Sequence, residues 1–173
     1  MNTVILAQII GYFVTATTLV SQQLKNMTVI SLLAIVSNAL ATASNFLNGG
    51  ITGAAICAVA VAQSTIALVC VRKKRNVPVW VTGIFAALYV IIGFITYKQP
   101  LDLLPSVAAL AFAFGIVQKK PSRYRILILI NGLIWIVYEL TLPIPNYAMA
   151  VTFILQSLSS IIGIIRLDIR RGK

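Results

Sequence analysis

Long apolar runs alternate with short polar segments along the whole chain. Seven of the runs approach the roughly 20 apolar residues that a membrane-spanning helix needs. They fall at about 3–20, 28–47, 51–71, 78–97, 101–117, 124–141 and 147–165, and none carries a charge near its centre. Because backbone groups in lipid must be hydrogen-bonded within their own segment, these runs predict helices rather than open strands. The pattern therefore predicts an all-α membrane protein with seven transmembrane helices.

Strongly polar residues inside these runs recur at one fixed spacing. Asn38 and Gln63 reappear 93 positions later as Asn131 and Gln156 (131 − 38 = 93), and a serine follows each glutamine. Such an internal repeat without gaps indicates two related halves. Three helices per repeat would place the second half in the membrane in the inverted orientation. The run at 78–97 has no counterpart in the repeat, and as one extra span it restores the orientation of the second half. We therefore expect a single domain in a 3+1+3 arrangement of two parallel three-helix repeats: residues 1–75, a connecting helix at 76–98, and residues 99–173.

Composition and charge agree with a bilayer as the main partner. The chain is 60% hydrophobic and 10% charged, which is not the composition of a soluble domain. The net charge is +11, but 13 of the 14 basic residues fall on one side if the seven runs alternate, and only Lys98 falls on the other. The positive-inside rule then predicts an outside N-terminus and a cytoplasmic C-terminus, and basic loops of this kind do not indicate a nucleic-acid partner.

The inventory of reactive side chains argues against an enzyme. The chain has no histidine and three acidic residues, of which Asp102 and Glu139 are predicted at the outer boundary and Asp168 on the inner tail. Cys57 and Cys70 lie about 20 Å apart on one predicted helix and cannot bridge each other. No metal site, cofactor or acid–base pair is expected. With no ionisable group at mid-membrane, any transport would be passive.

The repeated amides allow two interpretations. An unpaired amide in hydrocarbon costs about 4–8 kcal/mol, so each amide must find a partner. In one interpretation the amides bond neighbouring helices together. In the other they line a cavity and bind the hydroxyls of a solute beside an aromatic ring. The candidate solute-binding residues are Asn38, Thr42, Gln63, Asn131, Trp135 and Gln156.

Short motifs resemble those of the SWEET and half-size SemiSWEET sugar transporters. Ser21-Gln22 and Val117-Gln118 stand where that family has a Pro-Gln pair, without the proline. Segments 134–138 and 155–159 resemble its second-helix and third-helix motifs. SWEET carriers are built from parallel repeats, so the resemblance implies a facilitative carrier of a small polar solute, with its site between the repeats.

The whole chain more closely resembles the YgjV-type bacterial inner-membrane proteins. The resemblance rests on Leu6-Ala7-Gln8, on the segment from Pro100 to Pro105, and on Ile164-Ile165-Arg166. It implies a multi-pass protein of the bacterial inner membrane and no particular activity. Two functions stay open: a SWEET-like transporter, and a non-transporting scaffold or partner-binding subunit. Small-residue faces at 54, 58 and 62 and at 111 and 115 leave homo-oligomer formation open as well.

Overall fold

The computed structural model describes residues 3–141 and 147–169, and this part of the chain is helical. The α-helices are α1 (Thr3–Gln22), α2 (Met27–Leu47), α3 (Ile51–Arg72), α4 (Val79–Ile95), α5 (Leu104–Ile116), α6 (Pro121–Thr141) and α7 (Tyr147–Gly163). A 3-10 turn, η1 (Pro100–Leu103), precedes α5, and a π-helix, η2 (Ile164–Ile169), continues α7. Each apolar run of the sequence thus contains one α-helix, which confirms the all-α prediction.

Polar residues between the runs set the helix ends. Asn26 caps α2, because its side-chain oxygen accepts a hydrogen bond from the Thr28 amide at 2.9 Å. Gly49 follows α2 with φ 78°, a backbone conformation that glycine adopts without steric cost. Asp102 accepts the amides of Lys98 and Gln99, both at 2.9 Å. The Asp102 carboxylate therefore caps η1.

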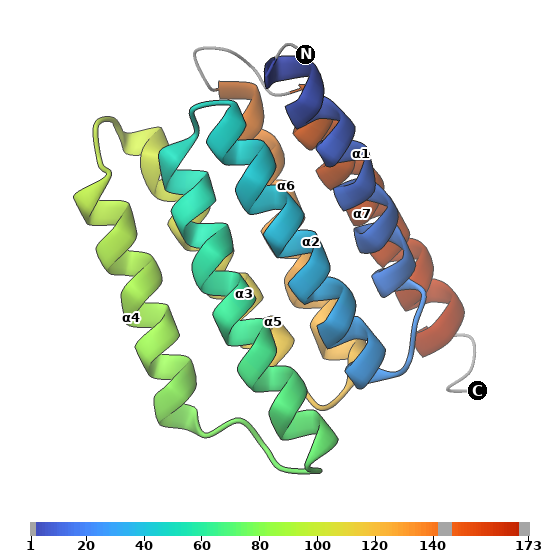
Figure 1. Cartoon of the computed structure of the whole chain (residues 1–173). Helices are drawn as coiled ribbons and strands as arrows, with labels where there is room; N and C mark the ends of the chain where they lie inside the picture. The colour runs from blue at the N-terminus through green and yellow to red at the C-terminus, as the bar shows by residue number, and fades with distance from the viewer. Residues whose placement is uncertain (1–2, 142–146, 170–173) are drawn as a thin grey trace.

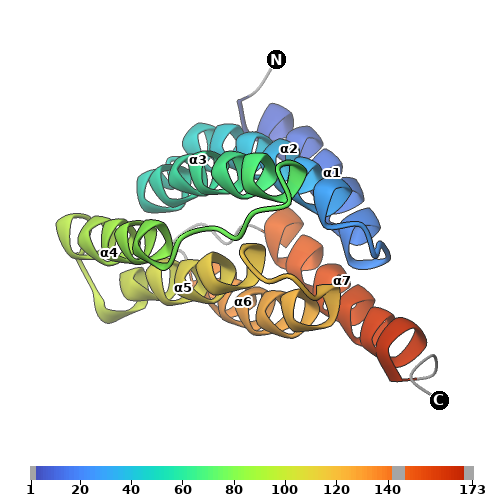
Figure 2. The same ribbon diagram turned by 90° about the horizontal axis from the view of Figure 1, so that it is seen from below.

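The helices form two facing layers (Figures 1 and 2). In one layer α2 packs between α1 and α3, and in the other α6 packs between α5 and α7. The layers meet where α1 packs on α7 and where α3 packs on α5, while α4 lies beside α5 and also contacts α3. The larger apolar core lies between the layers and contains Tyr89, Trp135 and Phe153.

The outer surface of the bundle is apolar. Among the described residues, five helices are long and apolar enough to cross a membrane: α1, α2, α3, α6 and the segment from α7 to Asp168 of η2. Helix α4 and the segment 100–116 are shorter apolar helices. Large apolar side chains such as Phe46, Trp80 and Phe94 are exposed on the outside. A surface of this kind is stable against lipid hydrocarbon rather than water.

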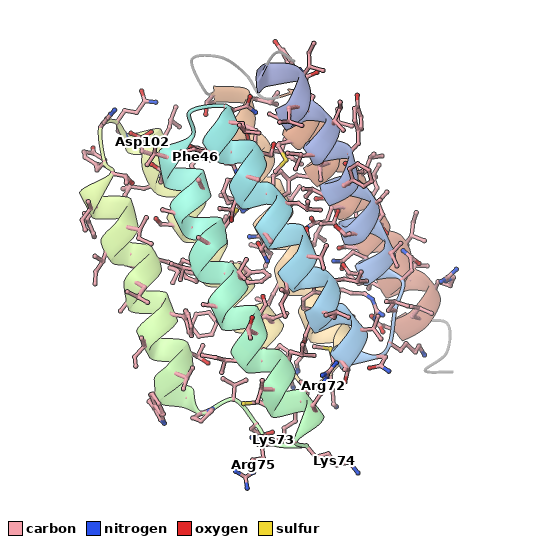
Figure 3. The ribbon with its side chains drawn as sticks, viewed as in Figure 1. Phe46, Arg72, Lys73, Lys74, Arg75 and Asp102 are labelled. Atoms are coloured by element: carbon pink, nitrogen blue, oxygen red, sulfur yellow. The ribbon has the colours of Figure 1, made fainter. Side chains whose placement is uncertain are left out.

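Charge is distributed unevenly along the bundle axis. The four consecutive basic residues at 72–75 lie at one end of the bundle, and Asp102 lies at the opposite end (Figure 3). We call these the basic end and the Asp102 end. Helices α1, α3 and α7 run toward the basic end, and α2 and α6 start from it.

Candidate functional site

A cavity lies between the two layers. Its volume is about 70 Å³. A cavity needs roughly 10–15 Å³ to hold one water, so this one has room for several waters. Its polar lining consists of Thr18, Ser21 and Gln22 on α1, Ser37 and Asn38 on α2, Tyr124 and Asn131 on α6, and Gln156 on α7. No charged side chain occurs among the described residues that line it.

The structure brings four of the six predicted solute-binding residues to this cavity. They are Asn38, Asn131, Trp135 and Gln156. Thr42 does not line it, and its hydroxyl donates to the Asn38 carbonyl within α2 at 2.8 Å. Gln63 does not line it either.

Gln63 instead connects three helices. Its Nε2 donates to the Ala113 carbonyl on α5 at 3.1 Å, and its Oε1 accepts a hydrogen bond from the Tyr89 hydroxyl on α4 at 2.9 Å. The Gln63 side chain is 2% exposed. The contacts of Gln63 therefore fit the interpretation in which the amides bond neighbouring helices together.

Gln156, its partner in the predicted repeat, is differently placed. It is 4% exposed and lines the cavity near the middle of α7. Within residues 3–141 and 147–169 its amide has no hydrogen-bond partner. A buried amide without a partner is costly unless water or a ligand satisfies it. Gln156 therefore presents donors and an acceptor to whatever occupies the cavity.

The side chains of Asn38 and Asn131 each make one hydrogen bond within the described chain. Nδ2 of Asn38 donates to the Ala34 carbonyl in its own helix, and Nδ2 of Asn131 donates to the Ala108 carbonyl on α5, both at 2.8 Å. Neither Oδ1 has a partner in the described part of the chain. Both acceptors are consequently free for water or a solute in the cavity.

Trp135 is held rigidly at the cavity wall. Its ring stacks on Phe153 with a centroid distance of 5.4 Å and an interplanar angle of 11°. Tyr138 meets it edge-on at 5.6 Å and is buried, so it is not an anchor at the membrane surface. One face of the indole is thus covered by protein, and the ring has little freedom to turn.

A partly buried ion pair at the basic end was not predicted from the sequence. Arg125 is 1% exposed, and its Nη1 contacts both carboxylate oxygens of Asp168 at 2.9 and 3.0 Å. The sequence assigned Arg125 to the basic loops and Asp168 to the tail, because each stands at the end of an apolar run. The only sequence signal was their opposite charge at ends that share one side of the membrane.

These features define a class of protein: a polytopic helical membrane protein with an uncharged cavity inside the bundle, lined by apolar side chains and several polar ones. The chain matches the Imp-YgjV family, described as bacterial inner membrane proteins, over residues 5–171. It belongs to this family, which confirms the closer of the two resemblances and assigns the chain to the bacterial inner membrane as a multi-pass protein. No curated protein and no solved structure matches the chain.

Proposed function

We propose that this protein is a non-enzymatic, facilitative transporter of a small neutral polar solute, similar to the SWEET carriers. The observation that carries the proposal is Gln156, whose largely buried side chain lines the cavity and makes no hydrogen bond within the described chain. The unused acceptors of Asn38 and Asn131 lie on the same cavity. Several unused hydrogen-bonding groups around one space suit a ligand with hydroxyl or amide groups.

The uncharged lining supports a neutral solute. A charged solute held away from water needs a charge of opposite sign or a dense set of hydrogen bonds. The described lining has neither a carboxylate nor a basic side chain. A sugar-like molecule, which carries hydroxyls and no charge, matches the available groups.

The arrangement of the helices supports two parallel repeats in a 3+1+3 plan. Shifting α2 by 93 positions gives 120–140, against 121–141 for α6, and shifting α3 gives 144–165, against 147–163 for α7. Under this shift α1 corresponds to α5. The contact of α1 with α7 then corresponds to that of α5 with α3, and both contacts are present. A twofold axis along the membrane normal would relate the two halves, as in SWEET carriers.

We further propose that all seven helices cross the membrane. The 17 residues of α4 extend about 26 Å at 1.5 Å per residue, near the lower limit for a roughly 30 Å hydrocarbon layer. With seven spans, the basic end faces the cytoplasm and the N-terminus lies outside. Helices α1 and α5 are then the candidate gates on either side of the cavity.

Counterflow of labelled sugars and other small neutral solutes in proteoliposomes tests the function. We expect saturable exchange by the native protein and loss of most exchange in Gln156→Ala and in Trp135→Ala. Leu158→Ala is the matched control, because Leu158 lies on α7 two residues from Gln156 and is exposed on the outside. This control should exchange like the native protein.

The outcomes separate the two functions left open above. Exchange that survives both cavity variants would keep a transporter and remove this cavity as its site. Absence of exchange across a broad panel of solutes, with folded protein in the vesicles, would favour a scaffold or partner-binding subunit. In that case the remaining amides would be assigned the packing role that Gln63 has, which is to join neighbouring helices by hydrogen bonds.

A further inference from the structure

Arg125 joins three helical segments at the basic end. It lies in the first turns of α6, and its Nε donates to the Gln22 carbonyl at 2.8 Å while Nη2 donates to the Leu24 carbonyl. Nη1 binds the carboxylate of Asp168 in η2. The guanidinium group therefore holds the end of α1 to the end of the α7–η2 segment. We call Arg125 and Asp168 together the latch.

The chemistry of the latch explains why arginine is needed. The last carbonyls of a helix have no partner within the helix, and α1 ends at Gln22. Arginine carries five N–H donors in a planar fork, so one side chain can serve two carbonyls and a carboxylate at once. Lysine has the same charge but cannot reproduce this fork. Asp168 balances the charge of the buried Arg125, and each of the two depends on the other.

The neighbouring part of the α1–α7 contact is also polar. The Ser160 hydroxyl donates to Oε1 of Gln22 at 3.0 Å, and Nε2 of Gln23 donates to the Ser159 carbonyl at 2.9 Å. Water can replace hydrogen bonds of this kind at a small net cost, whereas separating an apolar contact exposes hydrocarbon to water. The basic end of this contact is thus suited to opening.

Gly163 permits the closed arrangement. A Cβ atom at this position would lie 2.8 Å from the Gln22 carbonyl oxygen and 3.1 Å from Cδ and Nε of Arg125. Because glycine has no Cβ atom, the helix backbone at Gly163 lies closer to the latch than it could with any other residue at this position. Alanine at this position would push α7 away from the end of α1.

The latch adjoins the part of the cavity nearest the basic end. The lining residues there are Ser21, Gln22 and Tyr124, and all three are buried. Arg125 follows Tyr124 in the chain and binds the backbone of Gln22. A space with room for several waters must widen before it accepts a larger solute, and these residues lie at its end nearest the basic face.

We propose that the Arg125–Asp168 latch is the gate of the cavity toward the basic face. With the latch closed, the end of α1 covers the cavity; with the ion pair broken, α1 separates from α6 and α7 and the cavity opens on that face. The gate rests on the proposed function for its purpose, but its geometry can be tested without any solute.

Cysteine accessibility tests the gate. In a Cys57→Ser/Cys70→Ser background, Ser37→Cys places a thiol on the cavity wall, and Ser64→Cys places one at a buried position of α3 that does not line the cavity. A charged, membrane-impermeant methanethiosulfonate reagent is added to sealed vesicles of either orientation. Lys74→Cys, exposed at the basic end, identifies the vesicles in which that end is accessible.

We expect Asp168→Asn to accelerate modification of the Ser37→Cys thiol at least 10-fold from the basic face and to leave the Ser64→Cys thiol unreactive. Gly163→Ala should act in the same direction without changing any charge. Arg123→Gln is the control for an unrelated change of one charge at the basic end, although of opposite sign, because Arg123 lies two residues before Arg125 and is exposed. This control should leave both rates unchanged.

Three results would overturn the proposal. Equal acceleration at both thiols would mean that the latch only stabilises the fold, and acceleration from the opposite face would place the gate elsewhere. No acceleration in either latch variant would mean that the ion pair does not control access. Accessibility that responds as expected in a protein without counterflow activity would instead remove the proposed function and keep the gate.

Discussion

The same substitution at the two glutamines of the predicted repeat should change the free energy of unfolding by different amounts. Gln63→Met and Gln156→Met each replace an amide by an apolar side chain of similar length. Gln63 makes two hydrogen bonds, to Ala113 and to Tyr89, whereas Gln156 makes none within the described chain. We therefore expect Gln63→Met to lower the free energy of unfolding and Gln156→Met to leave it nearly unchanged.

The magnitude follows from the partners that each variant leaves behind. A hydrogen bond between membrane helices contributes about 0.6 kcal/mol on average, and a buried donor left without a partner costs about 1–3 kcal/mol. Gln63→Met loses two bonds and strands the buried hydroxyl of Tyr89, so its loss should be about 2 kcal/mol. Gln156→Met loses no bond to a described residue and removes a buried amide, so its change should stay within about 0.5 kcal/mol.

Equilibrium unfolding in mixed micelles with increasing dodecyl sulfate measures both values. Tyr89→Phe completes a double-mutant cycle with Gln63→Met, and the two losses should not add, because both variants break the same hydrogen bond. Equal losses for the two glutamine variants would refute the distinction between a packing amide and a cavity amide. The same conclusion would follow if Gln156→Met proved the more destabilising.

Two further predictions concern packing and orientation. A Cβ atom at Gly132 would lie 2.8 Å from the Ser157 hydroxyl, so Gly132→Ala should destabilise the α6–α7 contact by about 1–3 kcal/mol. Adding Ser157→Ala should restore most of this loss in the same unfolding measurement. Failure of this rescue would locate the strain in the backbone. A thiol introduced by Lys74→Cys should react with an impermeant reagent in inside-out vesicles and not in intact spheroplasts, and the reverse result would invert the proposed topology.

The sequence predicted the helices well and the cavity in part, for different physical reasons. Length and apolarity predict where a helix lies in such a chain, and each run therefore overlaps one of the helices α1 to α7. Which side of a helix faces a neighbour depends on packing between segments far apart in the chain. Asn131 and Gln156 were correctly expected near the middle of their helices. Only the packing of the two helix layers shows that these two residues line the cavity and that Gln63 does not.

The connecting helix offers a physical account of the different roles of Gln63 and Gln156. On the proposed repeat, α3 and α7 are equivalent, and each meets the first helix of the other half, α5 or α1. Only α3 also has α4 beside it, and Tyr89 of α4 provides the donor that satisfies Gln63. The predicted plan has no eighth helix that could provide a hydrogen-bond donor for Gln156. The single unpaired span would therefore satisfy one amide and leave its counterpart facing the cavity, and the proposed solute site would then have unlike walls.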